Sequence, residues 1–247
     1  MTKKGWIIFA VLCAAILGGL IYMSQQGKVN VDHIDADTLQ TADEGAIGDH
    51  VIGKTDSKVV LIEYGDFQCP GCRTAAPVLK TVAEKYKDKI AFVFRNYPLT
   101  SIHPNALAAA SAAEAAGLQG KYWEYHDKLY ANQASWQGLS GTSRTDYFVE
   151  IANNLGLDTG KLRTDIENDA VRSKINLDIA LGKKKGVTGT PAIYLNGKSV
   201  SDVYVKDGKI VDANTEGAQQ AWSSAEALEK AVIIPALKEH GISVDEK

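Results

Sequence analysis

The sequence is poor in cysteine, in proline and in net charge of either sign. Three cysteines and six prolines in 247 residues are too few for a disulfide framework or a collagen-like chain. The 27 basic and 30 acidic residues give a net charge of −3 at pH 7, which lacks the basic excess of a nucleic-acid-binding domain. The remaining composition, 45% hydrophobic and 23% charged, is that of a globular protein and excludes a wholly disordered chain.

Long hydrophobic runs are also rare, and the clearest one lies near the amino end. Residues 6–23 carry no charge, and a membrane-spanning helix needs about 20 apolar residues. Two lysines precede this run, whereas residues 24–50 contain one lysine and six acids. The positive-inside bias therefore predicts a cytoplasmic tail over 1–5, a transmembrane anchor over 6–23 and an extracytoplasmic main body. A cleaved signal peptide is the alternative, and 24–50 is predicted to be a flexible acidic linker.

After residue 50, the hydrophobic pattern predicts strands, then helices, then strands again. An apolar, β-branched run over 58–64 predicts a buried strand, the spacing from Cys72 to Tyr86 predicts a helix, and 90–96 predicts a second strand. This order is typical of a parallel βαβ unit, with 51–53 as a short edge strand. Four helical segments, two strand segments and a last helix follow: residues 106–116, 122–130, 146–155, 162–182, 191–195, 203–211 and 222–240.

The chemical motif is Cys69-Pro70-Gly71-Cys72, which lies between the first predicted strand and its helix. A zinc half-site would need a second ligand pair, and the sequence holds no other cysteine pair and no closely spaced histidines. A purely structural disulfide closing so short a loop would stabilise the fold little. A redox dithiol fits better, because exposed N–H groups at a helix amino end favour the thiolate of Cys69.

Several longer motifs accompany the dithiol between about Gly48 and His240. They are EYGDFQCPGC, NYPLTSIHPNALAAASAAEAAGLQGKYWEYHDKLY, NLGLD and GVTGTPAIYLNG, in this order. The sequence resembles the DsbA-like branch of the thioredoxin superfamily, and especially its anchored, BdbD-type members. The resemblance implies an α/β thioredoxin fold over 51–102 and 187–241, an inserted all-helical domain over 103–186, and a C-terminal tail over 242–247.

The resemblance also implies roles for five residues. Cys69 matches the nucleophilic thiol and Cys72 the buried resolving thiol. Pro191 matches the cis-proline opposite the dithiol, and Thr190 precedes it with a backbone that binds a substrate strand. Glu63 matches a buried acid that exchanges protons with Cys72, and an acid in a run as apolar as VVLIEY is costly to bury without a function.

Weaker candidates surround these residues. His103 is expected to cap or pack at a helix start, and the aromatic residues of 122–136 are expected to form the core of the helical domain. No metal and no cofactor are expected, since the Cys69–Cys72 pair would itself be the redox group. Substrate-binding residues are expected beside the dithiol and the proline loop: Phe67, Gln68, Pro70, Gly71 and Gly189.

The function implied is a monomeric, extracytoplasmic thiol-disulfide oxidoreductase that oxidises cysteine pairs of reduced exported proteins. Such an oxidase needs reoxidation by a membrane quinone-linked partner of the DsbB or VKOR type. The strong oxidant of the family has a histidine between its cysteines, whereas Pro70-Gly71 stands here. A disulfide reductase or isomerase using the same dithiol is therefore an alternative, and a non-enzymatic client-binding module is another.

Overall fold

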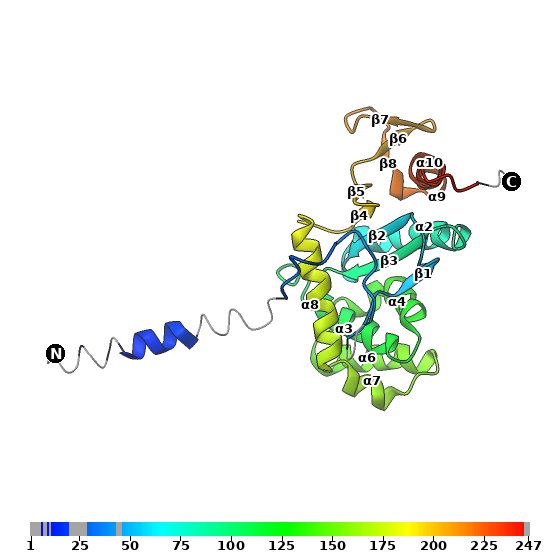
Figure 1. Cartoon of the computed structure of the whole chain (residues 1–247). Coiled ribbons are helices and arrows are strands. Elements are labelled where there is room, and N and C mark those ends of the chain that lie inside the picture. Colours follow the sequence, from blue (N-terminus) through cyan, green and yellow to red (C-terminus); the bar gives the residue numbers. More distant parts are fainter. Residues whose placement is uncertain (1–5, 7–8, 10, 20–28, 43–45, 245–247) are drawn as a thin grey trace.

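A five-stranded sheet forms the centre of the computed structural model, with strand order β1-β3-β2-β4-β5 (Figure 1). The structure describes all residues except 1–5, 7–8, 10, 20–28, 43–45 and 245–247. The central strands β2 and β3 are buried along almost their whole length, because apolar and β-branched residues face both sides of the sheet. The five strands are β1 (Val51–Gly53), β2 (Val60–Gly65), β3 (Ala91–Asn96), β4 (Ala192–Leu195) and β5 (Lys198–Ser199).

The predicted βαβ unit is present and its strands are parallel. Helix α2 (Pro70–Lys85) connects β2 to β3, and Glu63 of β2 lies opposite Phe94 of β3 in the register. Strand β1 lies at the edge of the sheet, as predicted, and pairs antiparallel with β3. Strand β4 pairs antiparallel with β2 on its other side, which brings the segment after Pro191 next to the strand that leads to the dithiol.

Two helical layers cover the sheet. Apolar residues of α2 and of the C-terminal helices pack on the face that carries Leu61 and Phe92. Helix α8 (Asp169–Lys184) packs on the opposite face, against Ile62 and Val93. The strand alternation therefore directs Glu63 toward the α2 side of the sheet, where the dithiol lies.

The segment between β3 and β4 is helical, as the spacing predicts. Its alanine-rich helix α3 and aromatic helix α4 pack together below the sheet (Figure 1). The predicted helix over 162–182 is two helices, because the Asn168 side chain accepts a hydrogen bond from Ala170 N and so starts α8 anew. The other helices are α3 (Ala106–Gly117), α4 (Tyr122–Ala131), α5 (Gln133–Trp136), α6 (Gly141–Asn154) and α7 (Thr159–Asp165).

Two tight turns define the strands near the carboxyl end. Asn196 and Gly197 have φ values of 45° and 79°, and Asp207 and Gly208 have 51° and 74°, as a two-residue hairpin turn requires. The first turn connects β4 to β5. The second connects β6 to β7 in a separate three-stranded sheet that projects beyond the main sheet (Figure 1). Its strands are β6 (Tyr204–Lys206), β7 (Lys209–Val211) and β8 (Gln219–Gln220).

The last predicted helix is interrupted. It consists of a 3-10 turn η1 (Ala221–Ser223), α9 (Ala225–Leu228), a π-helical segment η2 (Glu229–Ile233) and α10 (Ile234–Glu239). Ser224 is the N-cap of α9, and its side chain accepts a hydrogen bond from Ala227 N. The π segment ends next to Pro235, whose missing N–H removes one α-helical hydrogen bond.

The amino-terminal segment differs from the prediction of a flexible linker. Among its described residues, Val31 and Ala36 are buried, and Arg95 of β3 donates hydrogen bonds to the carbonyl oxygens of Ala36 and Thr38. The predicted anchor lies partly outside the described residues. Its described positions 6, 9 and 11–19 are helical, and no helix in the described part of the chain has the length and apolar character needed to cross a membrane.

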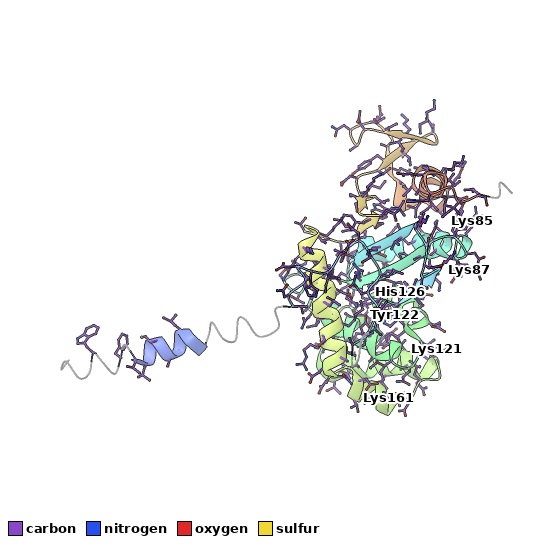
Figure 2. The ribbon with its side chains drawn as sticks, viewed as in Figure 1. Lys85, Lys87, Lys121, Tyr122, His126 and Lys161 are labelled. Carbon is purple, nitrogen blue, oxygen red and sulfur yellow. The ribbon has the colours of Figure 1, made fainter. Side chains whose placement is uncertain are left out.

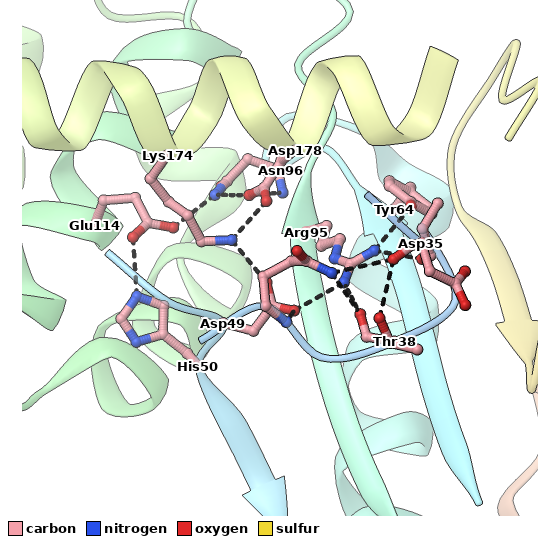
Figure 3. Close-up of polar contacts among 12 residues, drawn as sticks. Asp35, Thr38, Asp49, His50, Tyr64, Arg95, Asn96, Glu114, Lys174 and Asp178 are labelled. Atoms are coloured by element: carbon pink, nitrogen blue, oxygen red, sulfur yellow. Dashed lines mark hydrogen bonds and ion pairs between the residues drawn. The ribbon is translucent and has the colours of Figure 1, made fainter. Parts of the chain in front are cut away.

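A buried ionic cluster fixes this segment to the sheet and to α8. Asp49 accepts hydrogen bonds from Arg95 Nη2 at 2.8 Å and from Lys174 Nζ at 2.9 Å (Figure 3). Lys174 also donates to Asp178, one turn along α8, at 2.5 Å. The two cations hold the pKa of Asp49 well below its usual range although burial opposes this. Residues 46–50 therefore belong to the folded body.

Candidate active site

The two cysteines of the motif lie at the start of α2 in different environments. Cys69 is the N-cap residue with extended backbone angles, and Pro70 occupies the first helical turn, where its missing N–H costs nothing. Cys69 is 8% exposed and Cys72 is 0% exposed. Both are free cysteines, so the structure shows the dithiol form. A partner thiol can therefore approach Cys69, whereas Cys72 is reached through Cys69.

The environment makes Cys69 the acidic thiol of the pair. A hydrogen bond from the Cys72 thiol is the largest cause that lowers the pKa of Cys69 to about 5, and the N–H groups of Cys72 and Gly71 add to it. Burial opposes this shift but does not overcome it. Burial raises the pKa of Cys72 well above its ordinary value, and the neighbouring charge of Glu63 acts in the same direction. At neutral pH the dithiol consequently holds one thiolate, on Cys69.

Glu63 is the buried acid behind the dithiol. Its side chain is fully buried on β2, next to the Cys72 thiol. Burial raises its pKa to about 8, and the charge of Cys69 contributes to this shift. A carboxyl group with this pKa exchanges protons near neutral pH, which is the property that a buried acid–base group requires.

The proline loop faces the dithiol. The Thr190–Pro191 peptide bond is cis, and the Cys69 thiol donates a hydrogen bond to the Thr190 carbonyl oxygen at 3.3 Å. A Cβ atom placed on Gly71 would lie 3.1 Å from Pro191 Cδ and 3.6 Å from Cys69 Sγ. Glycine at position 71 thus lets the loop and the dithiol approach closely. Gly189, on the same loop, is exposed.

Two of the expected substrate-binding residues have other positions. Phe67 is 1% exposed, and its ring packs against those of Phe94 and Tyr130, both at 5.1 Å. Its side chain therefore belongs to the core and does not line a groove. Gln68 is also buried, because its amide donates to Gln137 O at 3.0 Å and accepts from Asn105 N at 2.8 Å. Residue 68 connects the dithiol loop to the helical region.

Asp66 is a residue that the sequence reasoning missed. Its carboxylate accepts hydrogen bonds from Gln68 N at 2.7 Å, from Leu99 N at 2.8 Å and from His103 Nδ1 at 2.8 Å. Its own N–H lies 3.5 Å from Cys72 Sγ. Asp66 therefore holds the dithiol loop against the loop after β3. A buried-strand end followed by Gly-Asp, just before a redox motif, is the sequence signal that could have identified it.

Gln133 of α5 is the second missed residue. Its side-chain amide donates to the carbonyl oxygens of Phe67 at 2.8 Å and of Cys69 at 3.0 Å, and the side chain is buried. The helical region thus contacts the backbone of the dithiol loop directly. No local pattern in the sequence identifies this residue, because the contact joins positions more than sixty residues apart.

An aromatic cluster joins the helical region to the underside of the dithiol. His126 of α4 lies at its centre, with the rings of Phe94, Trp123 and Tyr130 at 4.9, 5.0 and 5.0 Å. Figure 2 shows His126 and Tyr122 where the helical region meets the sheet. Burial lowers the pKa of His126, so the ring is neutral. Among the described residues no group of three potential metal ligands gathers, here or elsewhere.

A CxxC dithiol at the start of a helix, preceded by a β-strand and opposed by a cis-proline loop, defines a protein of the thioredoxin class. A family model described as Thioredoxin matches residues 46–213, and the chain belongs to this family. Within the superfamily it is DsbA-like. It is similar to the structure of DsbA2 from Pseudomonas aeruginosa, with 28% identity and a TM-score of 0.51, over 62% of this chain and 84% of that chain.

Two other similarities are of different kinds, one to a solved structure and one to part of a longer protein. The structure of oxidised BdbD from Bacillus subtilis has a TM-score of 0.59 over 81% of this chain and 97% of that chain, and at 21% identity it shows the fold. The chain is 37% identical, over 150 residues, to a Na(+)/H(+) antiporter NhaA 1 from Salinispora arenicola strain CNS-205. That match covers 61% of this chain and 22% of the antiporter. The chain therefore spans about a quarter of the length of the curated relatives it matches.

Proposed function

We propose that the protein oxidises cysteine pairs of other proteins through the Cys69–Cys72 disulfide. The observation that carries this direction is the low pKa of Cys69, about 5, beside a Cys72 whose pKa is raised. A stabilised thiolate lowers the free energy of the reduced enzyme and makes its disulfide a stronger oxidant. The environment of the dithiol thus supports this direction, although no histidine lies between the cysteines.

The first step is attack of a substrate thiolate on Cys69 Sγ of the disulfide. The substrate–Cys69 bond forms, the Cys69–Cys72 bond breaks, and Cys72 leaves as a thiolate. Glu63 in its carboxylic acid form then protonates Cys72, which moves the negative charge from the thiolate to the Glu63 carboxylate. A second substrate thiolate attacks the substrate sulfur of the mixed disulfide, so that the substrate disulfide forms and Cys69 leaves as a stabilised thiolate. Two electrons have passed from the substrate to the enzyme.

The surface around Cys69 provides the binding site for the substrate backbone. Pro70, next to Cys69 in the chain, and Gly189, on the loop that contacts Cys69, are exposed, and Gly71 leaves space beside the thiol. Thr190, before the cis-proline, presents its backbone to an extended substrate segment, as in pairing at a sheet edge. Recognition through the backbone suits an enzyme whose clients share reduced cysteines rather than a common sequence.

Reoxidation and location complete the proposal. The clients are reduced exported proteins, and a membrane quinone-linked protein of the DsbB or VKOR type returns the dithiol to the disulfide. The uncharged run over residues 6–23, with lysines before it and acids after it, supports a membrane anchor and an extracytoplasmic body. The enzyme works as a monomer. Protease accessibility in intact cells and in spheroplasts tests the location independently of the chemistry.

Measurement of the reduction potential in glutathione buffers tests the direction. We expect a value between about −180 mV, that of protein disulfide isomerase, and about −120 mV, that of a strong periplasmic oxidant. A value near that of thioredoxin, about −270 mV, would instead establish the reductase alternative.

Replacement of the nucleophile separates an enzyme from a client-binding module. Cys69→Ser is expected to abolish oxidation of a reduced model protein. Cys72→Ser is expected to trap a mixed disulfide when its Cys69 thiolate attacks the disulfide form of that protein, because no second thiol is left to resolve it. Oxidation that continues unchanged in Cys69→Ser would exclude the dithiol chemistry.

A further inference from the structure

Cys72 carries negative charge while the Cys69–Cys72 bond breaks or forms. In the proposed reaction it leaves as a thiolate when a substrate attacks Cys69, and it is the nucleophile when the disulfide is re-formed. Its side chain is 0% exposed, so water does not solvate this charge. Such a reaction gains most from a fixed hydrogen-bond donor that already points at the atom where the charge develops.

The backbone N–H of Asp66 is a donor of this kind. It donates a hydrogen bond to Cys72 Sγ at 3.5 Å, and residue 66 is itself 0% exposed, so water does not compete for this N–H. Burial is the largest cause that raises the pKa of Cys72, and the Asp66 N–H acts in the opposite direction. A hydrogen bond to neutral sulfur is weak, and it strengthens when the sulfur becomes an anion.

The side chain of Asp66 fixes the orientation of its own backbone. Its carboxylate accepts hydrogen bonds from Gln68 N at 2.7 Å and from Leu99 N at 2.8 Å. The third bond, at 2.8 Å, comes from His103 Nδ1, which is the donor because a carboxylate only accepts. The Asp66 carbonyl oxygen accepts from Cys69 N at 3.0 Å. Residue 66 is therefore held at its side chain and at its carbonyl while its N–H points to Cys72.

The loop that carries Leu99 and His103 is a firm support for Asp66. The N–H groups of Ile102 and His103 both donate to Leu99 O, at 3.0 and 2.9 Å, and close one turn. Asn105, at the start of α3, donates its N–H to Gln68 Oε1 at 2.8 Å. The dithiol loop is thus bonded to this support through Leu99, His103 and Asn105. The His103 side chain is 18% exposed, so it can be replaced without opening the core.

Given the proposed thiol-disulfide exchange, we propose that the Asp66 N–H, oriented by the Asp66 carboxylate and His103, stabilises the charge on Cys72 Sγ whenever the Cys69–Cys72 bond breaks or forms. The N–H touches the reacting sulfur, whereas His103 is a positioning residue that acts through it. The donor interacts weakly with the disulfide and with the Cys72 thiol, and strongly with the thiolate between them. It therefore speeds both directions and leaves the reduction potential unchanged.

The exchange with glutathione contains both directions. In the opening step a glutathione thiolate attacks Cys69 Sγ, the glutathione–Cys69 bond forms, and the Cys69–Cys72 bond breaks. Cys72 leaves with the electron pair as a thiolate bonded to the Asp66 N–H, and then takes a proton. The closing step is the reverse: Cys72 loses its proton and attacks Cys69 Sγ, the Cys69–Cys72 bond forms, and a glutathione thiolate leaves.

The test is His103→Leu, which removes one donor to the Asp66 carboxylate. Oxidised full-length protein is mixed with reduced glutathione, and reduced protein with glutathione disulfide. Both reactions are quenched with acid at successive times and analysed by mass spectrometry for disulfide, mixed disulfide and dithiol. Removal of an oxyanion-hole donor costs about 10²–10³ in rate; here the donor is only displaced, so we expect the opening and closing steps to slow by one common factor of at least about five.

The Cys69 thiolate supplies a readout that does not involve charge on Cys72. In a Cys72→Ser background this thiolate attacks glutathione disulfide and the reaction stops at the mixed disulfide. The backbone N–H groups that favour the Cys69 thiolate belong to Gly71 and to residue 72, not to residue 66. Adding His103→Leu to this background is therefore expected to keep the rate within about twofold, whereas a generally loosened loop would slow it.

Two further variants test the orientation of Asp66. His103→Asn keeps an N–H donor close to the position of Nδ1 and is expected to keep both steps within about threefold of the wild type. Asp66→Asn leaves one acceptor oxygen in place of two, so it is expected to slow the opening and closing steps as His103→Leu does. It also provides an independent measurement if His103→Leu does not fold.

His50→Leu is the matched control. The His50 ring also bonds a buried carboxylate, that of Glu114 at 2.9 Å, and it is 16% exposed, but it precedes β1 instead of following β3. We expect both of its steps to match the wild type. The proposal is overturned if His103→Leu and Asp66→Asn leave the two steps unchanged, if they slow them by unequal factors and so shift the reduction potential, if the Cys72→Ser background slows equally, or if His50→Leu has the same effect. A wild-type protein that forms no disulfide and oxidises no substrate would overturn the proposed function instead.

Discussion

At the residue scale, one short stretch of chain gives two identical side chains opposite acid–base behaviour. Cys69 accepts hydrogen bonds at the start of a helix, which lowers its pKa, whereas Cys72 is enclosed one turn later, next to the charge of Glu63, which raises its pKa. Burial of Glu63 raises its pKa to about 8. The reduced site therefore holds one negative charge, on Cys69 where the substrate binds, while Cys72 and Glu63 in the interior stay neutral.

The sequence could predict the site residues that belong to a recognisable local motif. The motif identified Cys69 and Cys72, and the structure places Pro191 and Glu63 beside them, as the resemblance implies. It could not show that Phe67 faces inward, because a residue next to a helix start has no periodic pattern to assign its face. Such assignments depend on which distant residues pack against the loop.

The buried acid makes stability depend on pH. Because the pKa of Glu63 rises from about 4.5 in the unfolded chain to about 8 in the folded reduced protein, the folded state binds more protons in this range. The contribution of Glu63 is favourable below pH 4.5 and is lost as pH rises toward 8, by up to roughly 5 kcal/mol at 1.4 kcal/mol per unit. Glu63→Gln is expected to abolish this loss and to raise the urea midpoint at pH 8. Glu150→Gln, on the exposed face of α6, is the control and should leave the pH profile unchanged.

At the element scale, the amino-terminal segment shows how composition can mislead. Acidic residues in a stretch of low hydrophobicity predict a solvated linker. In the structure Asp49 is buried between Arg95 and Lys174, and Lys184 donates to the carbonyl oxygens of Val31 and Ile34. The cations that pair with this segment come from β3 and α8, so only the tertiary arrangement explains why it is ordered.

Asp49→Ala measures how much the amino-terminal segment contributes to the free energy of unfolding. Removing the carboxylate leaves Arg95 and Lys174 buried without their shared partner, which is expected to lower the free energy of unfolding by about 3–5 kcal/mol. Asp56→Ala is the matched control, because its ion pair with Lys54 is exposed and such pairs contribute about 0–1 kcal/mol. Urea denaturation followed by circular dichroism compares the two. Equal, small effects would mean that the segment is the loosely attached linker that composition predicts.

At the scale of the whole molecule, the order of strands and helices was predictable and the contacts between layers were not. Periods of 2 and 3.6 residues, with Gly and Pro at the turns, were enough to order the βαβ unit, the helical region and the final strands. The helical region reaches the dithiol through buried amides, Gln68 to Gln137 and Gln133 to Cys69. Through these hydrogen bonds the helical region holds the dithiol loop in position.

Gln133→Met tests whether the helical region holds the dithiol loop in position. Gln133→Met keeps the length of the side chain but removes the donors to Phe67 O and Cys69 O, leaving two buried carbonyl oxygens short of a partner. We expect a loss of about 1–3 kcal/mol in stability, faster hydrogen exchange over residues 66–72, and slower reaction of Cys69 with glutathione disulfide. Gln119→Met is the control, because the Gln119 amide also bridges distant segments, to Asp158, but in an exposed position far along the chain from the dithiol. If both variants lose the same stability and neither changes exchange over 66–72, the helical region does not hold the site in place.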